Sequence, residues 1–318
     1  MKLPCWAAAA VLALITSCVN TMRSDGDVHG VAIPDLARPV VEAYPAPSQP
    51  SDAVKKAVWT RINRDRADNG LSPVAWDAAA SRVSDAFCEQ QVREQTQGHF
   101  LMDGLPPYAR MAFAGVFGLG EENSVSWITT GIAIEDNLVE YALTGHDRMM
   151  EERPPKDGHR RTILDPDATH VGVGYFVLGG RFQMSQEFLV RRLERLSLSR
   201  ASDRLPFIKV EGQVLAPDLI QFVTVAREPR PPALTRKQAS ARTSYSYPEP
   251  SEAFIPEGYR GLRIVGTLTS DRLRRRGDRE FSFTFRPVET GLFTFVFFVA
   301  QKDGDRPRQG GSATVLFE

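Results

Sequence analysis

Three stretches in the first half of the chain repeat their apolar residues at the spacing of an α-helix. In residues 52–69 an apolar residue recurs every four positions from Val54 onwards, and an Asn-Gly pair ends the pattern. Residues 78–94 and 134–150 show the same period. The pattern therefore predicts three amphipathic helices, and the Gly- and Phe-rich residues 101–120 between them predict a loop with a short helix.

The period changes to two after residue 169. Residues 170–177 alternate β-branched residues with glycines, a Gly-Gly turn follows at 179–180, and residues 182–188 return, which is typical of a β-hairpin. The preceding residues 157–166 form a polar stretch that ends at a proline and contains His159. This order predicts a loop that feeds a buried strand and places His159 beside a sheet edge.

The period of two dominates from about residue 205 to the end of the chain. The strand candidates, separated by Pro and Gly, are residues 210–214, 220–225, 262–269, 281–285, 292–299 and 313–317. Strand after strand without a helical period predicts an antiparallel, Ig-like β-sandwich over residues 205–318. The Pro- and Tyr-rich residues 227–260 predict a long surface excursion, and the serine-rich residues 196–205 predict the link between two independently folded units.

The first residues are typical of an export signal. A short apolar run, residues 6–15, follows Lys2 and is too brief to span a bilayer, and the run ends in Leu14-Ile15-Thr16-Ser17-Cys18. That junction resembles a bacterial lipobox, so residues 1–18 are interpreted as a lipoprotein signal peptide with lipidation at Cys18; the alternative is an ordinary cleaved signal peptide. Residues 19–51 are interpreted as a Pro-rich tether. We therefore expect a membrane-anchored protein of the cell envelope, at the outer membrane where the envelope has two membranes, and otherwise a secreted protein.

Charge and cysteine content narrow the choice of partners. The 39 basic and 39 acidic side chains balance, which argues against nucleic acid as a partner. Of three cysteines only Cys88 lies in the folded part, where one cysteine cannot form an internal disulfide, so we expect it to be a small buried apolar residue.

Several short motifs together resemble one protein family. Residues 158–164 read GHRRTIL, residues 169–174 THVGVG and residues 186–188 QEF, and Asn63 and Arg66 form an N-x-x-R pair. Gly98-His99 and Glu122-Asn123 lie between these ends. The set resembles the CAP superfamily (cysteine-rich secretory, antigen 5 and pathogenesis-related 1 proteins) in its bacterial SCP-like branch. Thr162 stands where that family usually has Asn, and residues 149–155 replace its usual Trp-x-x-Ser.

The resemblance implies a fold and a site. It implies an α+β chain with a CAP-type α-β-α sandwich over residues 52–195. In this fold His99 and His159 are expected to line a cavity and hold a divalent cation. Zn²⁺ is a candidate, because imidazole and carboxylate groups suit that ion. Glu122 and a second carboxylate are further ligands, or they orient the histidines. For the second carboxylate the residues leave Glu151 and Glu152 open, with Glu152 taken as the ligand.

Three classes of function remain open at this stage. The first is a surface-displayed binding module for a metal and a lipid, peptide or glycan ligand. The second is a metal-dependent, peptidase-like hydrolase with Glu122 as base, and the third is a structural or adhesive protein with a vestigial site. No common nucleophile, P-loop or dinucleotide motif is present in the sequence, which favours the binding module over an enzyme.

Overall fold

The structure is a computed structural model that describes residues 48–128, 137–202, 205–257, 269–277, 279–287, 289–303 and 305–317. The predicted signal peptide, Cys18 and nearly all of the predicted tether lie outside these residues, so the lipid anchor stays a prediction. Among the described helices, none combines the length and the apolar character that a membrane crossing requires.

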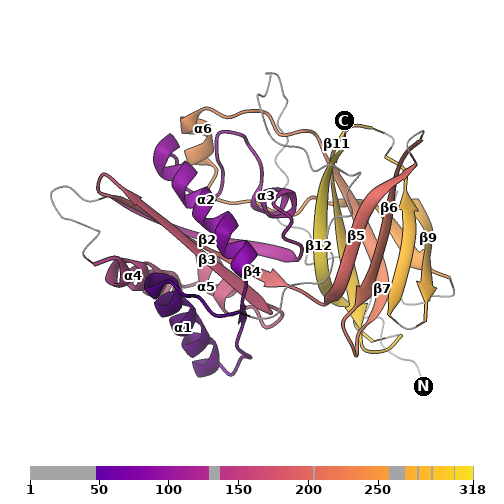
Figure 1. The fold of residues 1–318 in the computed structure, drawn as a ribbon, viewed down its shortest axis with the longest axis horizontal. Helices are drawn as coiled ribbons and strands as arrows, with labels where there is room; N and C mark the ends of the chain where they lie inside the picture. Colours follow the sequence, from indigo (N-terminus) through magenta and orange to yellow (C-terminus); the bar gives the residue numbers. More distant parts are fainter. Residues whose placement is uncertain are drawn as a thin grey trace.

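A four-stranded sheet forms the centre of the first half of the chain (Figure 1). Its strand order is β1 (Ala75–Trp76), β3 (His170–Leu178), β4 (Arg181–Val190) and β2 (Leu119–Ile128). β1 pairs in parallel with β3, and the other neighbours are antiparallel. The predicted hairpin is confirmed as β3 and β4, whereas β2, at the edge of the sheet, was not predicted from its mixed polar sequence.

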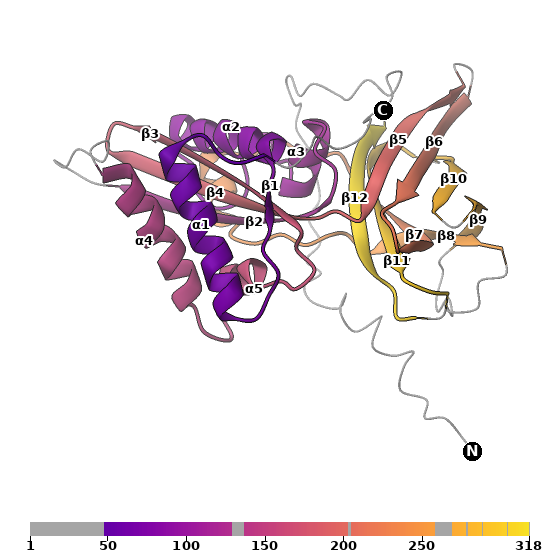
Figure 2. The same ribbon diagram turned by 60° about the horizontal axis from the view of Figure 1, so that its bottom comes forward.

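Helices cover both faces of this sheet (Figure 2). On one face lie α1 (Ala53–Asp68), α4 (Leu138–Glu151) and α5 (Gly158–Ile163), and on the other lie α2 (Ala78–Glu94) and α3 (Pro107–Phe113). The apolar stripe of α1 predicted from its period of four packs with α4, α5 and the sheet, and includes Val54, Val58 and Ile62. The three predicted helices are confirmed, and the layers form the expected α-β-α sandwich.

The second half of the chain forms one eight-stranded sheet. Its order is β12 (Arg308–Phe317), β11 (Gly291–Ala300), β7 (Leu219–Glu228), β8 (Pro250–Pro256), β9 (Thr269–Arg276), β10 (Glu280–Phe285), β6 (Leu205–Val214) and β5 (Leu193–Ser202). β8 and β9 pair in parallel and the other neighbours antiparallel.

This sheet curls around a single core, because strands far apart in the strand order touch through their side chains. Phe283 of β10 lies 6.1 Å from Phe295 of β11, and Phe281 lies 5.5 Å from Phe297, measured between ring centroids. Near the two edge strands, the backbone N–H of Arg192 donates to Gly310 O at 2.8 Å. The Ig-like sandwich of two sheets is therefore not confirmed; the structure shows one nearly closed sheet instead.

The boundary between the halves differs from the prediction. The residues expected to form a linker, 196–205, lie largely within β5, which pairs with β6 from Leu193 onwards. A domain end at residue 195 therefore falls inside a strand, and the chain passes between the sheets at Arg191-Arg192. Of the strand candidates, residues 262–269 lie almost entirely outside the described residues. β5 and β8 were not predicted, and β9 shares only Thr269 with a candidate.

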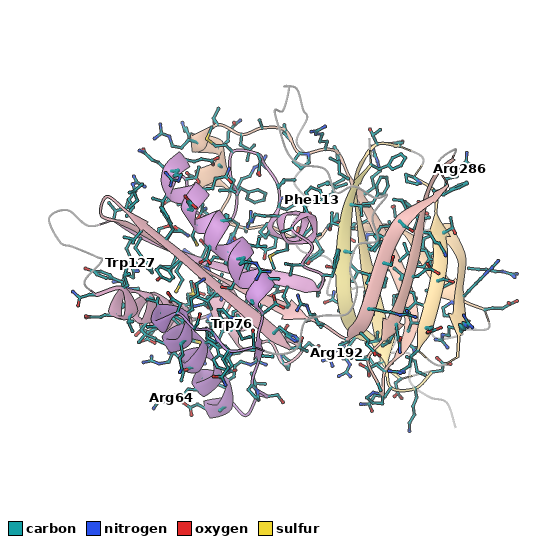
Figure 3. The ribbon with its side chains drawn as sticks, in the orientation of Figure 1. Arg64, Trp76, Phe113, Trp127, Arg192 and Arg286 are labelled. Carbon is teal, nitrogen blue, oxygen red and sulfur yellow. The ribbon has the colours of Figure 1, made fainter. Side chains whose placement is uncertain are left out.

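The two halves share a buried contact. Leu105, Tyr108 and Ala109 of the first half pack with Leu292 and Leu316 of the second. Figure 3 shows the partly buried Phe113 at the end of α3, on the side that faces β12. Whether each half folds alone stays a prediction, but in the intact chain each half buries apolar surface of the other.

Candidate functional site

A cleft of about 1160 Å³ lies between the two halves of the molecule. One wall comes from β2 and the stretch around α5, and includes Glu122, Glu152 and His159. The other wall comes from the eight-stranded sheet, with Val296 and Phe298 of β11, and from the segment between β7 and β8. His99 also lines it, so both histidines predicted for the site lie in this cleft.

His99 is held by a buried carboxylate. Its Nδ1 lies 2.9 Å from Oε1 of Glu122, whose side chain is completely buried. The other oxygen of Glu122 accepts from the guanidinium of Arg110 on α3, which lies over the ring of Phe87. Burial and the nearby Arg110 charge lower the pKa of His99 to about 4. The His99 imidazole is therefore neutral at pH 7.

His159 is held by the second carboxylate. It lies in the first turn of α5, and Glu152 directly follows α4. One oxygen of Glu152 lies 2.5 Å from His159 Nδ1, and the other accepts the backbone N–H of His159 at 3.0 Å. The geometry thus decides between the two candidates: Glu152 reaches the cleft, and Glu151 is an exposed residue that ends the helix.

The two imidazole rings lie side by side, with centroids 6.4 Å apart. Because a carboxylate oxygen binds each Nδ1, Nδ1 carries the hydrogen in the neutral ring and Nε2 keeps its lone pair. Among the described residues neither Nε2 has a hydrogen-bond partner, so Nε2 is the free nitrogen of each ring. In this pairing both Glu122 and Glu152 orient a histidine, which is one of the two roles expected for these carboxylates.

Glu187 is a buried acid that the sequence did not single out. It is opposite Glu122 in the β2–β4 register and is fully buried. Burial and the neighbouring Glu122 carboxyl raise the pKa of Glu187 well above its usual range, and burial also raises that of Glu122. Two carboxyls this close cannot both ionise cheaply, so Glu187 is the one that keeps a proton.

Strand β2 organises the site through three consecutive residues. Glu122 holds His99, while Asn123 Nδ2 donates to the backbone carbonyl of His159 at 3.1 Å. Glu121 accepts from Thr162 Oγ1 at 2.9 Å. Thr162, which replaces an expected Asn, therefore still ties α5 to β2.

A segment of the second half crosses the first half and reaches this site. We call residues 229–249, between β7 and β8, the crossing segment. It carries α6 (Arg236–Ala241), which lies beside α2 in Figure 1. Tyr245 and Tyr247 follow, and the hydroxyl oxygen of Tyr245 accepts from Glu122 N at 2.6 Å. The surface excursion expected over residues 227–260 is found over residues 229–249, which run over the first half of the molecule and into the cleft, whereas residues 250–256 form β8.

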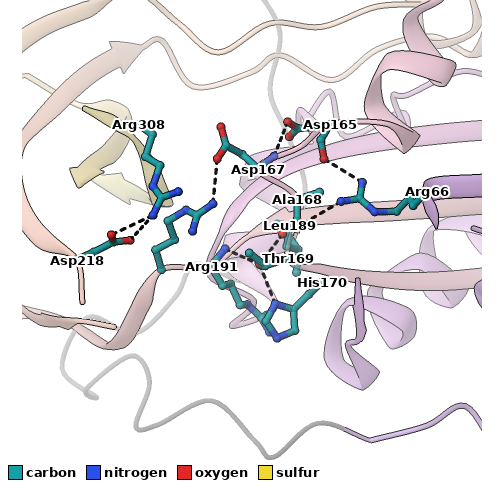
Figure 4. A network of polar contacts seen from close by, with 11 residues as sticks. Arg66, Asp165, Asp167, Ala168, Thr169, His170, Leu189, Arg191, Asp218 and Arg308 are labelled. Carbon is teal, nitrogen blue, oxygen red and sulfur yellow. Dashed lines mark hydrogen bonds and ion pairs between the residues drawn. The ribbon is translucent and has the colours of Figure 1, made fainter. Parts of the chain in front are cut away.

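A polar network connects the loop after α5 to the second sheet (Figure 4). Arg66 of α1 donates to the carbonyls of Ile163 and Asp165 at 2.8 and 2.9 Å. Beyond that loop, Arg192 pairs with Asp167 at 2.9 Å. His170 lies 2.9 Å from Thr169 Oγ1 in the same network, outside the cleft lining. His170 is the first residue of β3, so it lies at the entrance of that strand.

The cleft offers a metal ion two protein ligands, the imidazoles of His99 and His159. Within the described ranges, no group of three or more His, Cys, Asp and Glu side chains is arranged to hold a metal ion. A cation would therefore take Nε2 of His99 and of His159 and keep its other positions for water or a ligand. Cys88 stands apart as a buried free thiol whose pKa is raised by burial, as expected of a small apolar residue.

Arg110, Glu187 and Tyr245 are the site residues that sequence reasoning missed. Arg110 and Tyr245 belong to no local motif, and they lie 12 and 123 residues from Glu122. Glu187 did carry a signal, because it is the one charged residue in the predicted strand 182–188, and carboxylates are seldom buried without a partner.

The first half of the chain is an α-β-α sandwich whose cleft contains two carboxylate-held histidines, and comparison with known proteins identifies the family of this domain. Residues 59–189 match the model of the CAP family, described as the cysteine-rich secretory protein family. The chain therefore carries a CAP domain over these residues. No curated protein matches the chain.

Solved structures of low sequence identity are similar to the same part of the chain. An outer surface protein of Borrelia burgdorferi is 17% identical, with 45% of this chain and 96% of that one covered and a TM-score of 0.35. An extracellular SCP-domain protein of Bacillus anthracis is 18% identical, with 45% of each chain covered and a TM-score of 0.32. A cysteine-rich secretory protein of Staphylococcus aureus is 16% identical, with 45% and 41% covered and a TM-score of 0.30.

Proposed function

We propose that the protein is an exported binding module whose CAP cleft holds a divalent cation, such as Zn²⁺, between His99 and His159 and presents it to an extracellular ligand. The observation that carries this proposal is the pairing of each Nδ1 with a carboxylate, which leaves both Nε2 atoms free in one cleft. A carboxylate behind a histidine fixes the ring and strengthens it as a ligand. The cation would supply a positive centre for ligand oxygens.

The hydrolase alternative receives no support from the geometry. A general base needs a free oxygen within hydrogen-bond reach of the proton it removes. Both oxygens of Glu122 are engaged, one by His99 and one by Arg110, and the side chain is completely buried. Glu122 therefore orients a ligand residue in this proposal and has no role as a base.

Metal binding gives a direct test of the proposal. We expect titration calorimetry with Zn²⁺ at pH 7.5 to show one site in the wild-type chain and none after the double change His99→Ala and His159→Ala. Glu152→Gln should weaken binding by about tenfold to a hundredfold, the usual effect of losing a carboxylate behind a ligand. His170→Ala is the matched control, because His170 lies outside the cleft lining. Equal binding by the double variant would show that the ion sits elsewhere, and no binding by the wild type would leave a vestigial site.

The pH dependence of this binding has a defined sign. Imidazole binds metal in its neutral form, so protons compete as pH falls. With its pKa at about 4, His99 takes up almost no proton between pH 7.5 and 5.5, where a free imidazole of pKa about 6.5 would. In this window Kd should therefore rise by at most about one decade per pH unit, and a slope near two would contradict the lowered pKa of His99.

The export and anchoring part of the proposal rests on the lipobox-like junction at Cys18. A lipid anchor buries acyl methylenes in the membrane, and two or more chains make the attachment durable. We expect metabolic labelling with a fatty acid to mark the wild-type protein and to miss Cys18→Ser. Label on both proteins, or on neither, would contradict the anchor and leave an ordinary signal peptide.

A further inference from the structure

The crossing segment brings the side chains of the second half to the edge of the CAP sheet. β2 is an edge strand, so its outward N–H groups have no neighbouring strand to pair with. Tyr245 accepts from Glu122 N at 2.6 Å, and Tyr247 accepts from Gly120 N at 3.0 Å. Two tyrosines at alternate positions thus satisfy N–H groups at alternate positions of β2.

The two tyrosine hydroxyl groups differ in whether their hydrogen has an acceptor. The Tyr247 hydroxyl has acceptors, with Gly120 O at 3.2 Å and Ser312 Oγ at 3.4 Å. The Tyr245 hydroxyl has none in the part of the chain that the structure describes, because its one polar contact is the N–H from which it accepts. Tyr245 therefore holds an unused donor beside the histidine pair.

Two aromatic side chains hold the ring of Tyr245. The Tyr245 ring meets His99 edge-on, with centroids 5.2 Å apart, and lies 6.4 Å from Tyr108. Tyr245 also lines the cleft together with His99 and His159. Its ring thus packs between His99 and Tyr108 of α3 at the wall of the cleft, and its hydroxyl group lies at β2, 2.6 Å from Glu122 N.

The crossing segment is anchored to the CAP domain on the far side of α6 as well. Leu234 N donates to Met102 O at 2.7 Å, and Arg236 reaches Gln95 Oε1 at 2.7 Å. Gly98 and Gly104 allow the crossing segment to approach this closely. A Cβ at Gly98 would lie 3.0 Å from Arg242 O, and a Cβ at Gly104 would lie 2.3 Å from Pro232 O. Both glycines have a left-handed φ, of +88° and +76°. A side chain held by such contacts is preorganised for binding.

We propose that Tyr245 is a ligand-binding residue of the CAP cleft supplied by the second domain, and that it donates its hydroxyl hydrogen to an oxyanion, a carboxylate or phosphate group, bound at the histidine pair. This inference rests on the proposed function, because the cation there makes an anionic oxygen the favoured ligand atom. It adds that ligand selection in this chain belongs to both domains. The CAP domain supplies the histidines, and the crossing segment supplies the donor.

A cobalt-loaded full-length chain tests this assignment. Co²⁺ replaces Zn²⁺ as a visible probe, and its absorption is followed while acetate, in one series, or inorganic phosphate, in the other, is added. We expect Tyr245→Phe to weaken binding of at least one of these anions by about tenfold, the loss of one hydrogen bond to a charged acceptor, and to leave the Co²⁺ Kd within about twofold. The series with the larger loss identifies which oxyanion the site prefers.

Tyr247→Phe is the matched control. It also removes a hydroxyl that satisfies an N–H of β2, so its cost in stability is comparable, but its hydrogen already has acceptors. Anion affinity should stay unchanged in this variant. In wild-type protein carrying [4-¹³C]tyrosine, saturating anion should shift the Tyr245 resonance and leave that of Tyr247 in place, which tests the contact even where a variant folds poorly.

The outcomes separate the two proposals. If Co²⁺ binds and both phenylalanine variants keep the wild-type affinity for acetate and phosphate, the role of Tyr245 is wrong and the metal site stands. If the wild-type chain binds no Co²⁺, the proposed function fails and this inference fails with it. An equal loss of anion affinity in both variants would also overturn the inference, because it would show a general effect of loosening the crossing segment.

Discussion

Replacing Arg66 by methionine should lower the free energy of unfolding of the CAP domain by about 4 kcal/mol. The Arg66 side chain has no solvent exposure and donates to the carbonyls of Ser72, Ile163 and Asp165 at 2.8–2.9 Å, and to Ala168 at 3.4 Å. Methionine fills much of the space but supplies no donor. Each buried carbonyl left without a partner costs about 1–3 kcal/mol, and partial relaxation keeps the total near the stated value.

Thermal and urea unfolding followed by circular dichroism would measure this loss, with a Tm decrease of about 10 °C for a domain of this size. Arg64→Met is the matched control two residues earlier on α1. The Arg64 side chain is 74% exposed, and its ion pair with Asp68 is long, at 3.9 Å. Its removal should therefore change the free energy of unfolding by less than about 0.5 kcal/mol. A loss of similar size in both variants would mean that the Arg66 contacts contribute little.

The Arg66 contacts also connect stability to the site. Of its four acceptors, Ile163 ends α5, which carries His159, and Asp165 and Ala168 lie in the loop that leads from α5 into β3. Loosening that loop would displace α5 from Glu152 and Asn123, which hold His159. Arg66 of the N-x-x-R pair noted in the sequence thus joins the first helix to the loop that follows α5, the helix that carries His159.

The sequence predicted the parts of the site whose signal is local. The hairpin β3–β4 was evident because its alternation and its Gly-Gly turn lie within one short stretch. Glu152 could not be separated from Glu151 in the same way. The choice depends on the residue at which α4 ends, and helix ends are the least certain feature of a periodic pattern.

The remaining site residues act through partners far away in the sequence. β2 has a mixed polar sequence because three of its residues contact other elements. Glu121 and Asn123 contact α5, and Glu122 contacts Arg110 of α3 and His99. These partners lie 12 to 41 residues away in the sequence. Tyr245 is still more distant. No spacing rule connects side chains that only the packing of two domains brings together.

The curled sheet of the second domain shows a similar limit. Alternation predicts a row of buried phenylalanines on β10 and another on β11, and both rows lie in one core. β10 buries one face, whereas β11 buries residues of both faces. Alternation does not say whether the facing strands belong to two sheets or to one that curls. That outcome depends on strand pairing, including the parallel pair β8–β9, which follows the long crossing segment.

Replacing Gly174 by alanine should lower the free energy of unfolding by about 3 kcal/mol, at the upper end of the usual cost of overpacking. The second glycine of THVGVG lies under α2, and a Cβ there would come closer than 3.0 Å to Asp85 N and to the backbone carbon of Ser84. Backbone atoms of a helix cannot move aside singly, so α2 as a whole would have to shift. Because α2 leads into the Gly98-His99 turn, the shift should also weaken metal binding.

Two further variants show whether helix backbone contact is the cause. Gly179→Ala, in the hairpin turn, meets nothing within 4 Å and has only a left-handed φ of +58°, so it should cost about 1 kcal/mol. Adding Ser84→Gly to Gly174→Ala removes the nearby Ser84 Cβ but leaves the backbone atoms in place. Urea unfolding should therefore find the double variant as unstable as Gly174→Ala alone, and recovery of wild-type stability would mean that the side chain of Ser84, and not the backbone of α2, requires glycine at this position.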